Sequence, residues 1–218
     1  GGGSTYLALM LIWDIPYYIF PVIALICNIF VVSGNCFNYI KAGNLNLKLL
    51  TPYLIGSIPL AFFGGSLQID KNLFEIFLFI VLTLAGTLLL INFKSYDDNE
   101  STYKNVPIFI SIIIGAILGF LSGVVGVGGG IFLSPILFLI KAAKPKHIVT
   151  AASLFIFINS ISGVIGQLTK NIVLSDISNY WYLFLIVIIG GHIGNFLNLK
   201  IFPTRFLALI TSVLVLFV

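Results

Sequence analysis

Apolar residues fill most of this chain in long runs, and polar residues are confined to short breaks between them. Several runs are about 20 residues long, enough for a helix to cross a hydrocarbon core of about 30 Å. We therefore predict an all-α integral membrane protein. The predicted transmembrane segments are Tyr17–Tyr39, Leu49–Leu67, Leu73–Phe93, Ile148–Leu168, Tyr180–Leu199 and Phe206–Val218.

The polar linker 94–105 divides the chain into two related halves, 1–93 and 106–218. Placing the glycines 1–3 on the glycines 128–130 also places Ala24 on Ala151 and Ser33 on Ser160. Such internal repeats are typical of secondary transporters, whose binding site lies near the membrane midplane where the repeats meet. We expect a further helix before Gly1, although a Gly-Ser opening can also be a cloning remnant.

The segment Val106–Ile140 is too long for one crossing, since a single helix of about 35 residues would extend about 50 Å. It is either one broken crossing or a hairpin that turns at the glycines. The broken crossing distributes the Lys and Arg residues almost evenly between the two sides. The hairpin places nine of them on one side and only Lys71 and Lys170 on the other: Lys41, Lys48, Lys94, Lys104, Lys141, Lys144, Lys146, Lys200 and Arg205.

Such an asymmetry is what the positive-inside rule expects, so the charges favour the hairpin. Each half is then a Gly-broken hairpin or re-entrant segment followed by three transmembrane helices. Three crossings are an odd number, so we expect the second repeat to be inverted relative to the first.

Composition supports the membrane assignment and limits the function. The chain is 59% hydrophobic and 8% charged, with a mean hydropathy of +1.14, whereas soluble proteins have about 25% charged residues. The net charge of +4 reports topology rather than nucleic-acid binding. Two Cys and two His cannot form a metal cluster or a nucleophile–base pair at these positions, so we expect no enzyme, no metal and no cofactor.

One glycine-rich motif resembles a known family. The residues Gly119-x-x-Ser122-Gly123-x-x-Gly126-x-Gly128-Gly129-Gly130-x-x-x-x-Pro135 are similar to the hallmark of the TauE/SafE family of sulfite exporters, and Gly1-Gly2-Gly3-Ser4 resembles the end of the same motif. The resemblance implies a bacterial inner-membrane transporter with two related halves that exports sulfite or organosulfonates. The first repeat departs from the motif, with Ala8 in place of the proline.

The glycines also suggest where an anion binds. No Lys or Arg lies in the middle of a predicted span, so backbone N–H groups are the main candidate donors. Glycines 128–130 precede a short helix, whose N-terminus offers free N–H groups and partial positive charge. Residues 1–4 would form a facing counterpart. Alternatively, the glycines only allow close helix packing, the interpretation we favour for Gly115, Gly119 and Gly123.

Polar side chains within the spans are further candidates. We predict that Asn28, Asn35, Asn159 and Ser160 line the pathway, because polar groups at that depth must be paired or face a polar cavity. Ordinary hydrogen bonding between helices is the alternative. His192 lies inside a late span, and histidine is the residue type that ordinarily titrates near physiological pH, which suggests proton coupling. A neutral histidine bonded to a neighbouring helix is the alternative there.

These observations predict a secondary transporter of small anions, embedded in the lipid bilayer, with its site at the paired glycine breaks. The alternative function is a structural or assembly protein whose glycines serve only helix packing. An intramembrane enzyme is disfavoured, because it would need a nucleophile and base, or paired acids, at depth. The exact substrate, the direction of transport, the coupling ion and the oligomeric state are left open at this level.

Overall fold

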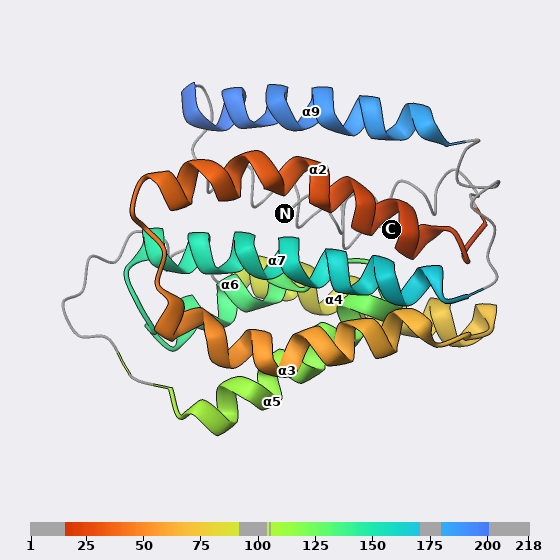
Figure 1. Ribbon diagram of the computed structural model, residues 1–218, viewed down its shortest axis with the longest axis horizontal. Coiled ribbons are helices and arrows are strands. Elements are labelled where there is room, and N and C mark those ends of the chain that lie inside the picture. The colour runs from red at the N-terminus through yellow and green to blue at the C-terminus, as the bar shows by residue number, and fades with distance from the viewer. Residues whose placement is uncertain (1–15, 92–103, 105, 171–179, 201–218) are drawn as a thin grey trace.

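The protein is a bundle of α-helices (Figure 1). The computed structural model describes residues 16–91, 104, 106–170 and 180–200, and within them every regular element is a helix, which confirms the predicted fold class. Five of the helices, α2, α3, α4, α5 and α7, are long and apolar enough to cross a membrane. The helices are α2 (Phe20–Lys41), α3 (Leu47–Ser66), α4 (Lys71–Ile91), α5 (Ile108–Val125), α6 (Gly130–Leu139), α7 (Pro145–Leu168) and α9 (Trp181–Lys200).

Two helices begin earlier than the apolar runs predicted, because local signals start them. The Asn46 side chain accepts a hydrogen bond from the Leu49 N–H at 3.2 Å and caps α3, which begins at Leu47 rather than Leu49. Helix α7 begins at Pro145, whose fixed φ suits a first helical turn. Both starts add polar residues that the hydrophobic pattern alone excludes.

The segment Val106–Ile140 is a hairpin. Helices α5 and α6 are its two arms, and the turn between them is glycine-rich. The N–H of Lys104, just before α5, donates a hydrogen bond of 3.0 Å to the carbonyl oxygen of Lys141, just after α6. The two ends of the segment are therefore on one side of the protein, and a single crossing is excluded.

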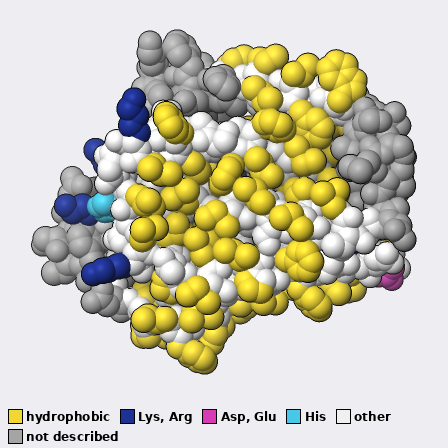
Figure 2. Space-filling view, viewed as in Figure 1, with side chains coloured by type: hydrophobic (Ala, Val, Ile, Leu, Met, Phe, Trp, Pro, Cys, Tyr) yellow, Lys and Arg dark blue, Asp and Glu magenta, His cyan; other side chains and the backbone are white. Residues whose placement is uncertain are grey.

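The two ends of the bundle differ in how many lysines they carry. At one end, His147 Nδ1 lies 2.8 Å from the Asn44 carbonyl oxygen, and Lys48 and Lys104 share a cavity with Ala142. The described lysines at this lysine-rich end include Lys41, Lys48, Lys104, Lys141, Lys144 and Lys146, and blue Lys and Arg side chains are visible there in Figure 2. Lys71 and Lys170 lie at the opposite end, as the hairpin prediction required.

Helix directions agree with the expected repeat. Helices α2 and α7, which the predicted repeat pairs with each other, run in opposite directions, and so do α3 and α9 (Figure 1). Opposite directions are what an inverted repeat requires. The equivalence of the halves 1–93 and 106–218 itself stays a prediction.

Small residues hold α3 and α5 together along a line that we call the glycine seam: Gly115, Gly119 and Gly123 of α5 against α3. A Cβ atom on these glycines would collide with the backbone of Tyr53, Ser57 and Ala61, respectively. The two backbones can approach so closely only because side chains are absent, as is common between membrane helices. The packing interpretation of these three glycines is confirmed.

The short helix α6 lies inside the bundle, and its residues Phe132, Leu133 and Leu137 are fully buried. Large apolar side chains instead cover the outside, among them Phe37, Phe79 and Phe109, each about 70% exposed. Figure 2 shows a broad apolar surface between the two ends. Such a surface is suited to contact with lipid rather than water.

Candidate functional site: the glycine break

Residues Gly126 to Gly129 interrupt the hairpin, and we call them the glycine break. Gly126, Gly128 and Gly129 have φ angles of 89°, 79° and 72°, which side chains strongly disfavour. Helix α5 ends where the Gly126 N–H donates to the Ser122 carbonyl oxygen at 2.8 Å. Helix α6 begins after Gly129, whose carbonyl oxygen accepts from Phe132 and Leu133. The local conformation therefore requires glycine.

The break is wedged between α2 and α7. A Cβ atom on Gly126 would lie 2.6 Å from the Pro21 Cα, and one on Gly130 would lie 2.6 Å from the Ala152 carbonyl oxygen. A Cβ on Gly128 would lie 2.9 Å from Asn28 Nδ2 and 3.3 Å from Ser160 Oγ. Gly128 therefore faces one polar side chain from α2 and one from α7.

The break leaves backbone donors unsatisfied. Within the described part of the chain, the N–H groups of Val127, Gly128 and Gly129 have no hydrogen-bond acceptor, and all three residues are buried. Buried N–H groups without partners are rare in proteins. They are next to the N-terminus of α6, which contributes partial positive charge. The arrangement is of the kind that binds anions.

Three buried side chains near the break also lack partners. Ser122 Oγ, Ser160 Oγ and Asn159 Oδ1 make no hydrogen bond to any described residue, although each of the three residues is at most 1% exposed. Asn159 Nδ2 donates to the Phe155 carbonyl oxygen at 2.9 Å, and Phe155 contacts Gly129. Unpaired buried polar atoms cost free energy, so they indicate a place for water or a ligand.

Asn28 has a different role, because its Nδ2 donates to the Gly126 carbonyl oxygen at 3.3 Å. The bond links α2 to the first residue of the break. It joins residues 98 positions apart, so no local pattern could have shown it. Asn28 therefore supports the shape of the break and also faces Gly128.

The structure brings together many of the predicted site residues. Asn28, Gly128 and Ser160 meet at the break, Gly129 and Gly130 continue it, and Asn159 is next to Ser160. Asn35 is half-buried, two turns or about 10 Å along α2 from Asn28, and its side chain has no hydrogen bond with the described part of the chain. Gly1, Gly2, Gly3, Ser4 and the side chain of His192 lie outside the described residues. The binding roles stay predictions.

One residue at the break was missed. Ser122 is part of the glycine motif, where its unpartnered hydroxyl is one turn before Gly126. In the sequence it stands only as part of the family motif, next to the seam glycine Gly123, and it was given no role of its own. Its position four residues before the first break glycine was the available signal.

Other polar side chains in the spans are structural. Ser162 Oγ donates to the Ile58 carbonyl oxygen at 2.7 Å, and Gln167 Nε2 donates to the Gly123 carbonyl oxygen at 2.9 Å. Cys27 and Cys36 are buried free thiols. The described residues contain no group of His, Cys, Asp or Glu that could hold a metal ion. Hydrogen bonding between helices accounts for Ser162 and Gln167, but not for Ser160.

The site lies near the middle of the helices that enclose it. Asn28 is the ninth of 22 residues in α2, counted from the end opposite the lysine-rich end. Ser160 is the sixteenth of 24 residues in α7, counted from the lysine-rich end. Both positions are therefore well inside the apolar layer, slightly toward the opposite end.

Comparison with known proteins gives a consistent result. The family model described as "Sulfite exporter TauE/SafE" matches residues 1–218. No solved structure matches the chain.

Three relatives are each named a probable membrane transporter protein. The one from Sinorhizobium fredii is 24% identical over 98% of this chain and 86% of its own length. The one from Methanocaldococcus jannaschii is 28% identical over 98% of this chain and 85% of its own length. The one from Bacillus subtilis is 24% identical over 88% of this chain and 76% of its own length.

Proposed function

The chain belongs to the sulfite exporter TauE/SafE family, and from this membership we propose that it carries a small sulfur oxyanion or sulfonate through the glycine break. It is an integral membrane protein and a membrane transporter rather than an enzyme. Sulfite is the first candidate substrate, because the family is named for it. Organosulfonates have the same cluster of acceptor oxygens and are the second candidate.

The observation that carries the proposal is the set of unsatisfied buried donors at the break. Three backbone N–H groups and the hydroxyls of Ser122 and Ser160 have no acceptor among the described residues. An SO₃ group offers three oxygens that could accept such bonds. Because donors left unpaired in the interior cost about 1–3 kcal/mol each, an anion that pairs with them would be bound favourably at the break.

The site has no charged side chain, and this suits transport. All described lysines lie at helix ends or in linkers, so the attraction at the break comes from backbone dipoles. Partial charges hold an anion less tightly than a buried cation would, and a transporter must also release its substrate. Asn159 Oδ1 adds one acceptor, which could pair with the proton of hydrogensulfite or the amino group of an aminosulfonate.

The family name implies export, and the orientation of the protein in the membrane gives the export a route. By the positive-inside rule the lysine-rich end faces the cytoplasm, which in a bacterium makes the inner membrane the location. A substrate would then leave through the end that contains Lys170. Gly1–Ser4 would form a second break in an inverted first repeat, and His192 on α9 would couple transport to protons; both are parts of the proposal.

Proteoliposome flux assays with sulfite, sulfoacetate and taurine, with and without a pH gradient, test the function. We expect wild-type protein to move sulfite and Ser160→Ala to move it at least about tenfold more slowly, because a hydroxyl donor is lost. Gly34→Ala is the matched control, since a Cβ atom there meets nothing within 4 Å.

Two outcomes would contradict the proposal. One is wild-type protein that moves none of the three compounds. The other is folded Gly128→Ala and Ser160→Ala protein that both transport at the wild-type rate. The second outcome would favour a protein whose glycines serve only packing.

A further inference from the structure

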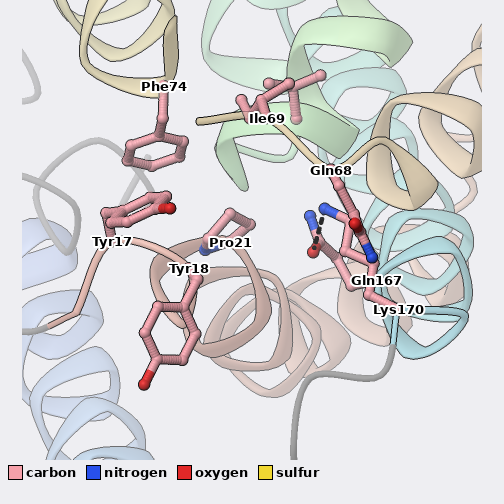
Figure 3. A pocket seen from close by; sticks show the side chains of 9 residues that line it. Tyr17, Tyr18, Pro21, Gln68, Ile69, Phe74, Gln167 and Lys170 are labelled. Atoms are coloured by element: carbon pink, nitrogen blue, oxygen red, sulfur yellow. Dashed lines mark hydrogen bonds between the residues drawn. The ribbon is translucent and has the colours of Figure 1, made fainter. Parts of the chain in front are cut away.

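A second cavity opens at the end of the bundle opposite the lysine-rich end. It has a volume of about 330 Å³, and we call it the outer cavity. One wall is aromatic, with Tyr17, Tyr18 and Phe74, and the facing wall is polar, with Gln68, Gln167 and Lys170 (Figure 3). The rings of Tyr17 and Phe74 contact each other at a tilt of 45°, with their centroids 5.8 Å apart.

The outer cavity adjoins the glycine break. Pro21 and Val124 line the cavity, and Pro21 is also the residue against which Gly126 packs. Val124 is two residues before Gly126, in the last turn of α5. An anion that leaves the break toward this end of the bundle would therefore reach the outer cavity next.

A chain of hydrogen bonds joins the polar wall to α5. Lys170 Nζ donates to Gln167 Oε1 at 3.0 Å, and Gln167 Nε2 donates to the Gly123 carbonyl oxygen at 2.9 Å. Gln167 is buried and held at both ends of its amide, which fixes the position of the ammonium group. An ammonium has three N–H donors, and one is used here, so two remain for a ligand.

Lys170 is the only cation that lines the outer cavity, and it has no acidic partner among the described residues. The titratable groups on the facing elements are Tyr17 and Tyr18. Asp70 precedes α4, where Lys71 pairs with Glu75 at 3.6 Å. An unpaired cation in a partly enclosed, low-dielectric cavity attracts anions more strongly than one in open water.

We propose that Lys170, positioned by Gln167, binds the transported oxyanion in the outer cavity and forms an access site between the glycine break and the medium. This inference rests on the proposed function and adds a second binding step to it. The break offers backbone donors, which act only at short range, whereas the charge of Lys170 acts over a longer distance. Lys170 would attract an anion from the medium, or would bind an anion that has left the break.

The charge of this site changes within an accessible pH range. Burial lowers the pKa of Lys170 from 10.5 to about 8. As pH rises through 8, the ammonium loses its proton and the cavity loses its cation. Anion affinity at this end of the protein should therefore fall as pH rises from 7 to 9.

The test measures KM and kcat for sulfite presented at the Lys170 end, in proteoliposomes sorted for orientation, from pH 6.5 to 9.5. We expect Lys170→Gln to raise KM about five- to tenfold at pH 7 with little change in kcat, and to match wild type at pH 9.5. Ratios of variant to wild-type KM at each pH cancel the titration of sulfite itself.

Two further variants separate binding from structure. Lys170→Arg should have the same low KM as the wild type at pH 7, and its KM should stay low above pH 9, because a guanidinium stays charged. Lys71→Gln is the matched control, a lysine at the same end that is paired with Glu75 and does not line the cavity. It should leave KM and its pH dependence unchanged.

The inference is overturned if Lys170→Gln has the wild-type KM and pH profile, or if Lys170→Arg behaves like Lys170→Gln. Its failure can be told from failure of the proposed function. If Ser160→Ala slows sulfite flux and Lys170→Gln does not alter KM, only the access site is wrong. If wild-type protein moves no sulfite, the proposed sulfite transport fails and the access site with it.

Discussion

Two glycine-rich regions lie next to each other on one hairpin and use glycine in different ways. In the glycine seam, Gly115, Gly119 and Gly123 are helical and contact the backbone of α3. In the glycine break, Gly126, Gly128 and Gly129 have positive φ, and Gly128 faces the polar side chains Asn28 and Ser160. The seam is close-packed, whereas the break leaves hydrogen-bond donors free. Glycine spacing therefore indicates packing, and glycine conformation indicates a site.

The largest effect should come from adding bulk to the seam. Gly119→Val would place a branched side chain against the Ser57 backbone, where neither helix can move away. We expect a loss of about 3 kcal/mol or more of stability, since overpacking of a core costs about 1–3 kcal/mol and the collision here is with backbone. The yield of folded protein and the midpoint of thermal unfolding in detergent measure it.

If Gly119→Val gave well-folded protein with normal stability, the close packing of α3 on α5 would be wrong. Gly34→Val is the matched control, because a Cβ atom at Gly34 meets nothing within 4 Å. It should change stability by less than about 1 kcal/mol, and slightly upward, because valine has a higher helix propensity than glycine.

The next largest effect should come from the break, and it should be on transport. Gly128→Ala combines a strained φ of 79° with a Cβ atom 2.9 Å from Asn28 Nδ2. We expect sulfite flux to fall at least about tenfold, while stability falls by about 1–2 kcal/mol from backbone strain. Flux per folded molecule separates the two effects, and unchanged flux would contradict a site at the break.

Two serines on α7 offer a sharper comparison. Ser160 has a buried hydroxyl without a partner, whereas Ser162 donates to the Ile58 carbonyl oxygen. Ser160→Ala should reduce flux and leave stability unchanged or slightly higher, because an unsatisfied group is removed. Ser162→Ala should lower stability by about 1 kcal/mol and leave flux per folded molecule unchanged.

Thermal unfolding and flux measured on both variants would show the contrast. The same loss of stability in both would mean that Ser160 is structural. If only Ser162→Ala lost flux, the result would indicate that the substrate passes along the side of α7 that faces α3.

The smallest effect should be a dependence of stability on pH from Lys170. Its pKa is lowered from 10.5 to about 8 by burial, so between these values the unfolded chain binds more protons than the folded one. Stability should then rise as pH increases from 8 to 10.5. The rise should be smaller in Lys170→Gln, and equal slopes in the two proteins would contradict the burial of this ammonium.

The contrast between seam and break could be only partly predicted from the sequence. Four-residue spacing correctly indicated packing for Gly115, Gly119 and Gly123, because that spacing keeps residues on one helix face. Three consecutive glycines correctly indicated an interruption before α6. Ser122 was missed, because its hydroxyl differs from a packed serine only in lacking a partner, and partners come from other helices.

Asn28 and Asn35 show the same limit. Both are spaced for one face of α2, yet Asn28 is buried against Gly126 and Asn35 is half-buried two turns away. The spacing specifies the face, and the neighbouring helix specifies which residues on that face are enclosed. The turn of the hairpin reaches the level of Asn28, and its first carbonyl meets the Asn28 amide there.

By itself the sequence determined the membrane location, the helices, the hairpin and the family. Each depends on local quantities: the length of apolar runs, the sides on which lysines fall, and a short motif. Only the tertiary structure decided which polar atoms are paired. Ser160 and Ser162 are two residues apart in one helix, and their difference comes from α3, more than 100 residues away. Whether a buried donor is satisfied depends on contacts between distant segments, so the proposed binding site at the glycine break is a property of the packed bundle.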